Sequence, residues 1–155
     1  MIKFGQPAAH PGAGTQGPAR VVTAAGLAVD AYVHADLASV YDPVRAGISQ
    51  GDLFRVEAAA SALAALLVLL SARPLVWAFA FLVAASGLGA LLLYRYVDVG
   101  ALGPLPNMYE PLWFTKKTAT AVAEALAAVT ALAGLVGSFA RARAPAGASA
   151  GQYSP

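Results

Sequence analysis

A stretch of more than twenty residues, from Leu75 to Asp98, is apolar and carries no charge before Arg95. At about 1.5 Å per residue, a helix of this length crosses the roughly 30 Å hydrocarbon core of a bilayer. The chain has 155 residues, of which 59% are hydrophobic and 12% charged. A soluble domain of this size could not bury so much apolar surface. The sequence therefore predicts an integral membrane protein.

Three further apolar segments complete an all-α bundle of four transmembrane helices. The first has a polar second half, and a signal peptide is the alternative for it, but no A-x-A cleavage spacing follows. Ser49 and Asp52 have the spacing of a capping box that starts the second helix, and Arg73-Pro74 ends that helix. Thr115 is a candidate cap for the fourth. We expect helices at about 20–41, 50–72, 75–98 and 115–141.

Short tails flank a single membrane domain. Residues 1–19 are rich in Gly, Pro and Ala, and we expect a flexible N-terminal tail before a domain at 20–143. Residues 144–155, rich in Ala, Gly, Ser and Pro, are expected to be disordered. Four crossings place both termini on the same side. About five Lys and Arg residues fall on each side, so the count in the positive-inside rule is tied. The side with the termini has no acidic residue, and its bases are Lys3, Arg20, Arg73, Arg141 and Arg143.

This uncompensated basic face suits the anionic inner leaflet of a plasma membrane. We therefore expect a multi-pass plasma membrane protein with cytoplasmic N- and C-termini. The opposite end of the bundle would face outward.

Ionisable residues gather at this predicted outer end. Asp30 and His34 are four residues apart, so they share a helix face and can hydrogen-bond. A charge at the bilayer centre costs at least about 2.5–3.5 kcal/mol, so such groups turn inward to pair or to line a wet cavity. The candidate polar cluster comprises Asp30, His34, Asp36, Arg55, Glu57, Arg95 and Glu124. Arg55 and Arg95 would balance its acids.

Two interpretations of this cluster stay open. Its salt bridges can fix the register of the helices, or it can bind a small solute, a proton or a metal ion. As metal ligands, His34, Glu57 and Glu124 would suit zinc or a harder cation. No cofactor is predicted: the chain has no cysteine for thiolate ligands or c-type haem, and the second histidine, His10, lies in the N-terminal tail.

Aromatic and basic residues follow the third helix. The loop 99–114 contains three prolines, and its aromatic side chains favour the membrane interface. We interpret part of this region as a surface for a partner, formed by Tyr109, Glu110, Trp113, Lys116 and Lys117.

Small residues recur at helical spacing, which lets helix backbones approach closely. The fourth helix has a seam of Thr120, Glu124, Ala127, Ala131, Gly134 and Ser138. Shorter stripes are Ala31, Ala35 and Ala38 in the first helix and Ala85 with Gly89 in the third.

The sequence lacks P-loop, dinucleotide, kinase and hydrolase signatures, and it has no basic run interleaved with aromatics for nucleic acid. The favoured function is a non-enzymatic accessory or scaffold component that binds a membrane-protein partner or further copies of itself. The alternative is binding or transport of a small solute, proton or metal, with His34 titrating near neutral pH. A membrane enzyme with Asp30, His34 and Glu124 as acid and base groups is the third hypothesis.

Three stretches carry a resemblance to known proteins: AYVHADLASVYD, ISQGDLFRVEAA and LYRYVDVGALGPLPNMYEPLWFTKKT. Over residues 20–140 the chain resembles a group of small, uncharacterised four-helix membrane proteins of high-GC Gram-positive bacteria. Its layout, with polar groups at one mouth of the bundle, is similar to that of the DoxX-like membrane families. The resemblance implies a four-helix membrane fold and leaves the activity open.

Overall fold

A computed structural model describes residues 16–143 and contains four helices, α1 (Gln16–Ala38), α2 (Gln50–Leu70), α3 (Pro74–Tyr96) and α4 (Thr115–Arg143). The described residues form no strand, so the predicted all-α fold is confirmed. Each helix is long and apolar enough to cross a membrane, α3 being the most apolar and α1 the least. The two predicted tails fall mainly on 1–15 and 144–155, outside the described residues.

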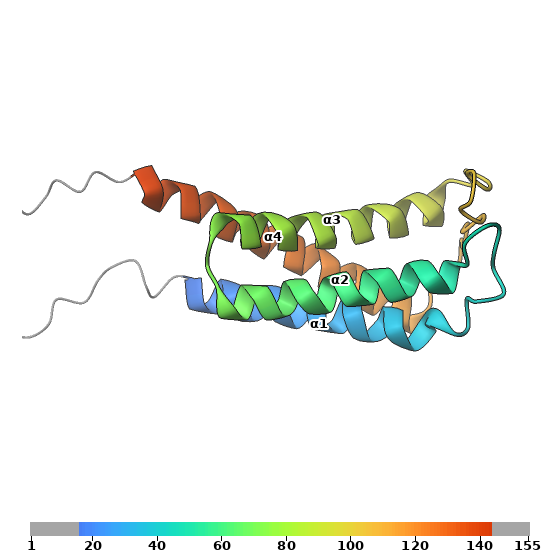
Figure 1. Cartoon of the computed structure of the whole chain (residues 1–155), viewed down its shortest axis with the longest axis horizontal. Coiled ribbons are helices and arrows are strands. Elements are labelled where there is room, and N and C mark those ends of the chain that lie inside the picture. Colours follow the sequence, from blue (N-terminus) through green and yellow to red (C-terminus); the bar gives the residue numbers. More distant parts are fainter. Residues whose placement is uncertain (1–15, 144–155) are drawn as a thin grey trace, which may run out of the picture.

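The helices α1, α2 and α3 run along the length of the bundle, and α4 crosses it obliquely (Figure 1). α1 begins and α4 ends at one end of the bundle, which we call the terminal end. The opposite, loop end carries the connections 39–49 and 97–114. The two connections touch, because the Ile48 N–H donates to the Pro104 carbonyl at 2.9 Å.

The helix bounds differ from the predicted ones at a few places. α1 starts four residues before Arg20, because Pro18 falls in its first turn, where a missing N–H breaks no hydrogen bond. α1 stops at Ala38 in a series of turns that leads to Pro43. Proline disfavours helical geometry in the residue before it, which accounts for an end before Tyr41. α2 and α3 each end two residues earlier than expected, and α4 two residues later.

The helix starts follow the local sequence. At α2 the Ser49 side chain accepts from the Asp52 N–H at 2.9 Å, and the Ser49 N–H donates to Asp52 Oδ2 at 3.3 Å. The predicted capping box is therefore confirmed. Thr115 does not cap α4 but is its first residue. Pro74 is likewise the first residue of α3, where its fixed φ suits a helix start.

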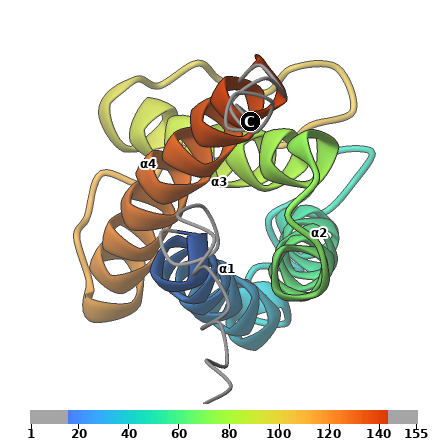
Figure 2. The same cartoon turned by 90° about the vertical axis from the view of Figure 1, so that its left-hand side faces the viewer.

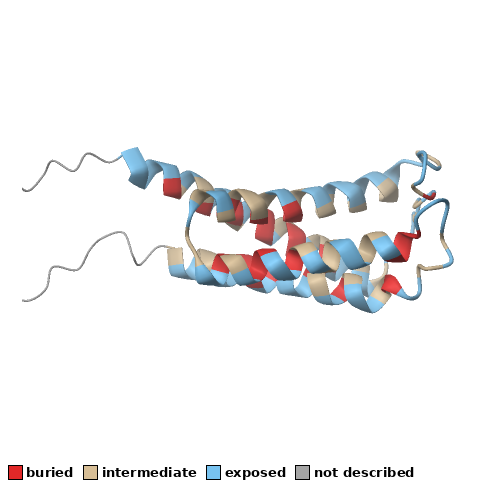
Figure 3. Ribbon diagram, viewed as in Figure 1, coloured by how far each residue is buried: buried red, intermediate tan, exposed pale blue. Residues whose placement is uncertain are grey.

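The buried residues lie where the helices face one another (Figure 3). Most of the buried apolar residues are alanines, and many large apolar residues are exposed. Ala64, Ala80 and Ala127 are fully buried, whereas Leu70 and Leu75 are 72% and 82% exposed. Apolar side chains on the outside of a helical bundle suit a lipid solvent, while small interior residues let the backbones approach. The distribution of side chains is thus compatible with an integral membrane protein.

The predicted α4 seam is buried along its whole length. It packs against α1, where a Cβ added at Gly26 would lie 2.6 Å from the Ala123 carbonyl oxygen. It packs against α3 through Gly134, which lies against the indole of Trp77. The other two stripes are only partly used, because Ala35 and Gly89 are exposed within the described chain.

The C-terminal end of α2 is capped by a side chain from α1. The last carbonyls of a helix have no partner within the helix, and hydrocarbon supplies no water to bind them. Arg20 fills this role, since its Nε donates to the Val68 carbonyl at 2.8 Å and its guanidinium also donates to the Leu69 carbonyl. α1 is therefore tied to α2 at the terminal end.

Replacing Gly134 by alanine is expected to destabilise the bundle. The new Cβ would lie 2.5 Å from Cδ2 of Trp77, a fully buried side chain that cannot retreat. Overpacking of this kind lowers the free energy of unfolding by about 1–3 kcal/mol. Thermal unfolding in detergent measures the effect. Gly137→Ala, one turn along α4 and with no contact shorter than 3.6 Å, is the control and should unfold like the wild type.

Candidate functional site

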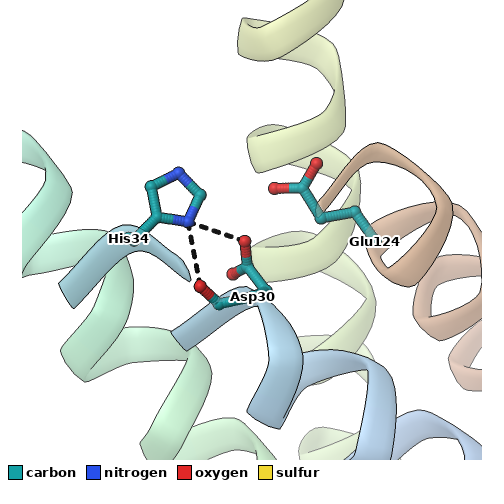
Figure 4. A group of neighbouring side chains, drawn as sticks. All are labelled: Asp30, His34 and Glu124. Atoms are coloured by element: carbon teal, nitrogen blue, oxygen red, sulfur yellow. Dashed lines mark hydrogen bonds and ion pairs between the residues drawn. The ribbon is translucent and has the colours of Figure 1, made fainter. Parts of the chain in front are cut away.

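Ionisable side chains from three helices meet inside the loop end. We call Asp30 and His34 of α1, Glu57 of α2 and Glu124 of α4 the inner acidic cluster. Figure 4 shows Asp30, His34 and Glu124 converging from α1 and α4. His34 Nδ1 lies 2.7 Å from Asp30 Oδ1 and 3.1 Å from the Asp30 carbonyl oxygen. The predicted pairing of these two residues is therefore present.

Asp30 accepts a hydrogen bond from a residue of α2. Its carboxylate is fully buried, and the Ser61 hydroxyl donates to Asp30 Oδ2 at 2.5 Å. Ser61 Oγ also lies 3.4 Å from Glu57 Oε1. Since a hydroxyl has a single proton to donate, Asp30 is its partner and Glu57 stays weakly bound. The hydrogen bond fixes Asp30 with its other oxygen towards His34.

Glu124 is the exceptional member of the cluster. It is 1% exposed, and neither of its carboxylate oxygens accepts a hydrogen bond from any described residue. One potential ligand atom from each of Asp30, His34 and Glu124 lies within 4.8 Å of the others. One turn earlier, the hydroxyl of Thr120 is also buried without a hydrogen-bond partner. Buried polar groups are nearly always paired, so Glu124 and Thr120 are candidates for contact with a ligand.

Gly87 of α3 provides the space for the carboxylates. A Cβ added there would overlap Oε1 of Glu124 and lie 3.1 Å from Oε1 of Glu57. The two acids therefore meet over the bare backbone of α3. We did not single out Gly87 as a site residue from the sequence, although it follows Ala80 and Ala84 at the spacing of a helix face.

The basic residues lie elsewhere. Arg55 makes a bidentate pair with Asp42, with both distances 2.8 Å, on the exposed surface of the loop end. It also lies 3.1 Å from Asp52. The expectation that Arg55 balances the inner acids is thus corrected: Arg55 pairs instead with Asp42 in the connection 39–49 and with Asp52 in the first turn of α2. Among the described residues, no Lys or Arg forms an ion pair with Asp30, Glu57 or Glu124.

Two further members of the predicted cluster also lie outside it. Asp36 pairs with Lys116 across α1 and α4 on the exposed side. Arg95 packs its guanidinium over the rings of Tyr96 and Trp113, at 4.9 and 5.4 Å from the ring centres. These contacts leave Asp30, His34, Glu57 and Glu124 as the residues that the structure brings together.

A cavity of about 320 Å³ leads from the loops to the inner acidic cluster. His34, Glu57, Gly87 and Thr120 line its part within the helices, and Glu110 and Lys117 line it near the loops. Its walls are mostly apolar and include the aromatic rings of Tyr41, Phe54, Tyr94 and Phe114. An apolar pocket with a few convergent polar groups is the usual form of a small-ligand site.

The predicted partner surface is split between the cavity and the exterior. Lys117 donates to the Glu110 carbonyl at 2.5 Å and lies 5.9 Å from the Trp113 ring centre, which closes the loop 97–114 onto α4. Tyr109 and Trp113 are 40% and 42% exposed. Lys116 is held by Asp36.

Two groups in the connection 39–49 have shifted acidity. Burial raises the pKa of the Tyr41 phenol, and Glu110 adds to the shift, so Tyr41 presents a neutral hydroxyl to the cavity. The hydrogen bonds from the Arg55 guanidinium lower the pKa of Asp42. Asp42 therefore stays ionised and keeps Arg55 at the surface.

Gly87→Ala is expected to push the Glu124 carboxylate aside, because the added Cβ would overlap Glu124 Oε1. We expect a loss of about 1 kcal/mol in the free energy of unfolding, the low end of the cost of overpacking, because the end of the Glu124 side chain can turn away. Chemical unfolding in mixed micelles measures it. Gly89→Ala on the same helix has nothing within 4 Å and serves as the control. Equal stability of the two variants would place the carboxylates away from α3.

Asp42→Asn is expected to lower stability near neutral pH and to have no effect in strong acid. Because the folded pKa of Asp42 lies below its usual value of 3.8, ionised Asp42 stabilises the fold above that value. This stabilisation disappears as the pH falls through the lowered folded pKa. Melting temperatures from pH 2 to 7 measure the difference between variant and wild type. A constant difference across this range would contradict the ion pair with Arg55.

No family model matches this chain, and searches of curated proteins and of solved structures give no match either. The resemblance to small four-helix membrane proteins of high-GC Gram-positive bacteria, and the DoxX-like layout, therefore stay predictions. The chemistry of the inner acidic cluster is the basis on which a function can be argued.

Proposed function

We propose that this protein is a multi-pass plasma membrane protein that binds a small cation at the inner acidic cluster, reached through the loop-end cavity. The observation that carries the proposal is Glu124, a buried carboxylate whose two oxygens have no partner among the described residues. An unpaired buried charge is among the most costly features a fold can contain. A bound cation, whether a proton or a metal ion, removes that cost.

The charge balance of the site supports a cation over an anion. Asp30, Glu57 and Glu124 carry three formal negative charges, and His34 supplies at most one positive charge. The nearby bases Arg55 and Lys116 are already paired at the surface. Ionisable groups within a membrane bundle normally pair with one another or mark the path of an ion. The cluster therefore has more carboxyl groups than basic groups.

The cavity supports access for a small solute. Its volume of about 320 Å³ is at the lower end of the range for small-molecule sites. Near the loops Glu110 stands beside Lys117, and farther in Glu57 is an acidic group of the cavity wall. A cation that enters from the loop end therefore passes Glu57 before it reaches Glu124.

The orientation belongs to the same proposal. Arg73, Arg141 and Arg143 are exposed at the terminal end, where the described chain has no acidic residue. A basic surface favours the anionic cytoplasmic leaflet. With both termini in the cytoplasm, the cavity opens to the outside.

The accessory or scaffold function predicted from the sequence is the second candidate. Its support is the apolar surface of the loop 97–114, on which Leu112 is 69% exposed beside Tyr109 and Trp113. Exposed aromatic residues in a loop suit contact with a partner as well as with the membrane interface. The two candidate functions do not exclude each other, because the cation site lies inside the bundle and the partner surface lies on the outside of this loop.

Glu124→Gln tests the proposal. The amide keeps the shape of the side chain but cannot ionise, so it cannot pair with a bound cation as a carboxylate does. The variant should therefore lose the rise in melting temperature that a bound cation gives the wild type. Thermal unfolding in detergent with sodium, magnesium, manganese, zinc and methylammonium salts measures the effect.

Asp36→Asn is the matched control, because it makes the same chemical change in an exposed carboxylate outside the cluster. It should keep the wild-type response to cations. If Glu124→Gln matches the wild type in every salt and across pH 5 to 9, no cation binds at Glu124 and the proposal is wrong.

A further inference from the structure

We infer that the cation is a divalent transition metal ion, held by one ligand atom each from Asp30, His34 and Glu124. This inference rests on the proposed function and names the ligand of that same site. The three residues are the metal ligands, and Glu57, Ser61 and Thr120 lie around them.

The positions of the three residues are close to those of a metal site. Their potential ligand atoms lie within 4.8 Å of one another. In a tetrahedral zinc site with bonds of about 2.0–2.2 Å, ligand atoms lie about 3.4 Å apart. Glu124 has three rotatable side-chain bonds and is held by no hydrogen bond from a described residue, so its carboxylate can turn towards His34 (Figure 4). Closing the site thus takes a rotation of the Glu124 side chain and the opening of the His34–Asp30 contact, because 2.7 Å is shorter than the separation of two ligand atoms on one ion.

The backbones that carry the ligands are fixed. α1 and α4 pack tightly at Gly26, and the Thr23 and Thr130 hydroxyls are hydrogen-bonded across the two helices at 2.7 Å. Asp30 lies one turn beyond Gly26. Ligands placed on rigid helices keep their geometry better than ligands on loops. Only side-chain motion is thus needed for binding.

Two buried polar groups without a described hydrogen-bond partner also point to a ligand, and this observation is separate from the clustering of acidic residues. Glu124 is 99% buried and its carboxylate is aimed at Asp30 and His34. Thr120, 2% exposed, lines the cavity with a hydroxyl that has no described partner. A metal ion satisfies the carboxylate, and a water molecule on the metal satisfies the hydroxyl. The open coordination position would then face the cavity.

The donor types select the kind of metal. An imidazole nitrogen with two carboxylates suits zinc, manganese, iron or cobalt, whereas magnesium and calcium prefer oxygen alone. Three protein ligands and an open position are also the arrangement of an accessible zinc site. Ser61 orients Asp30 through its hydrogen bond, as partners of metal ligands commonly do.

The experiment measures metal binding to the full-length protein in detergent after removal of bound metal with a chelator. Equilibrium dialysis and titration calorimetry with zinc, and visible absorption with cobalt, should give one metal ion per chain. Magnesium should bind at least a hundredfold more weakly than zinc. His34→Gln should weaken zinc binding at least tenfold and abolish the cobalt absorption bands.

His10→Gln is the matched control, because His10 is the other histidine of the chain and lies outside the described residues. It should bind zinc like the wild type. Circular dichroism checks that each variant is folded, and the wild-type stoichiometry tests the inference without any substitution.

The outcomes separate the two levels of the proposal. Failure of the wild type to bind zinc or cobalt, or equal zinc binding by wild type and His34→Gln, overturns the metal inference. If Glu124→Gln still changes the response to pH or to monovalent cations in that case, cation binding at the cluster stands without the metal. If Glu124→Gln matches the wild type throughout, both proposals fail.

Discussion

The close approach of α1 and α4 is the constraint on which the rest of the structure depends. At Gly26 the two backbones are so near that a single added carbon would lie 2.6 Å from the Ala123 carbonyl oxygen. Hydrocarbon gives helices no hydrophobic reason to associate, so close packing of small residues must hold them together. Asp30 lies one turn after Gly26, and Glu124 directly follows Ala123. The contact that stabilises the bundle therefore also brings two carboxylates to the same level.

Once these carboxylates are together, the position of the basic residues determines the chemistry of the site. Arg55 and Lys116 do not neutralise the buried carboxyl groups. Their ion pairs with Asp42 and Asp36 hold them at the surface. The result is a paired outer layer of charge and an unpaired inner acidic cluster. Structural salt bridges alone explain the outer layer. They do not explain Glu124, whose two oxygens have no described partner.

The sequence predicts the elements well because their signals are local. Segment length and hydropathy identify the four helices, and the capping box at Ser49 needs only residues three positions apart. The α4 seam is equally predictable, since its spacing places every member on one face and all of them are buried. The predicted start of α1 is too late, because Pro18 breaks a helix in most positions but is tolerated in its first turn.

The site is only half predictable, because its remaining features depend on distances between helices. Periodicity shows that Asp30 and His34 share a face, yet it cannot show that Arg55 turns to Asp42 in a neighbouring loop. It also cannot distinguish Gly87, which accommodates two carboxylates, from Gly89, which contacts nothing within 4 Å. Both glycines lie in the same apolar segment, and only the neighbouring helices separate their roles.

The helices that carry the proposed ligand residues differ from the helix pair beside the cavity in how closely they pack. α1 packs along α2 and α4, and α3 packs along α4, while α2 and α3 contact one another less (Figure 2). The proposed ligands come from the tightly packed α1 and α4, and α3 contributes the bare backbone of Gly87 to the cavity wall. The proposed ligands thus lie on the helices with the more extensive contacts, while the cavity wall includes α2 and α3, whose mutual contact is smaller than those of α1 with α2 and α4 or of α3 with α4. If a cation binds as proposed, the contact between α2 and α3 is where we expect the bundle to open for its exchange.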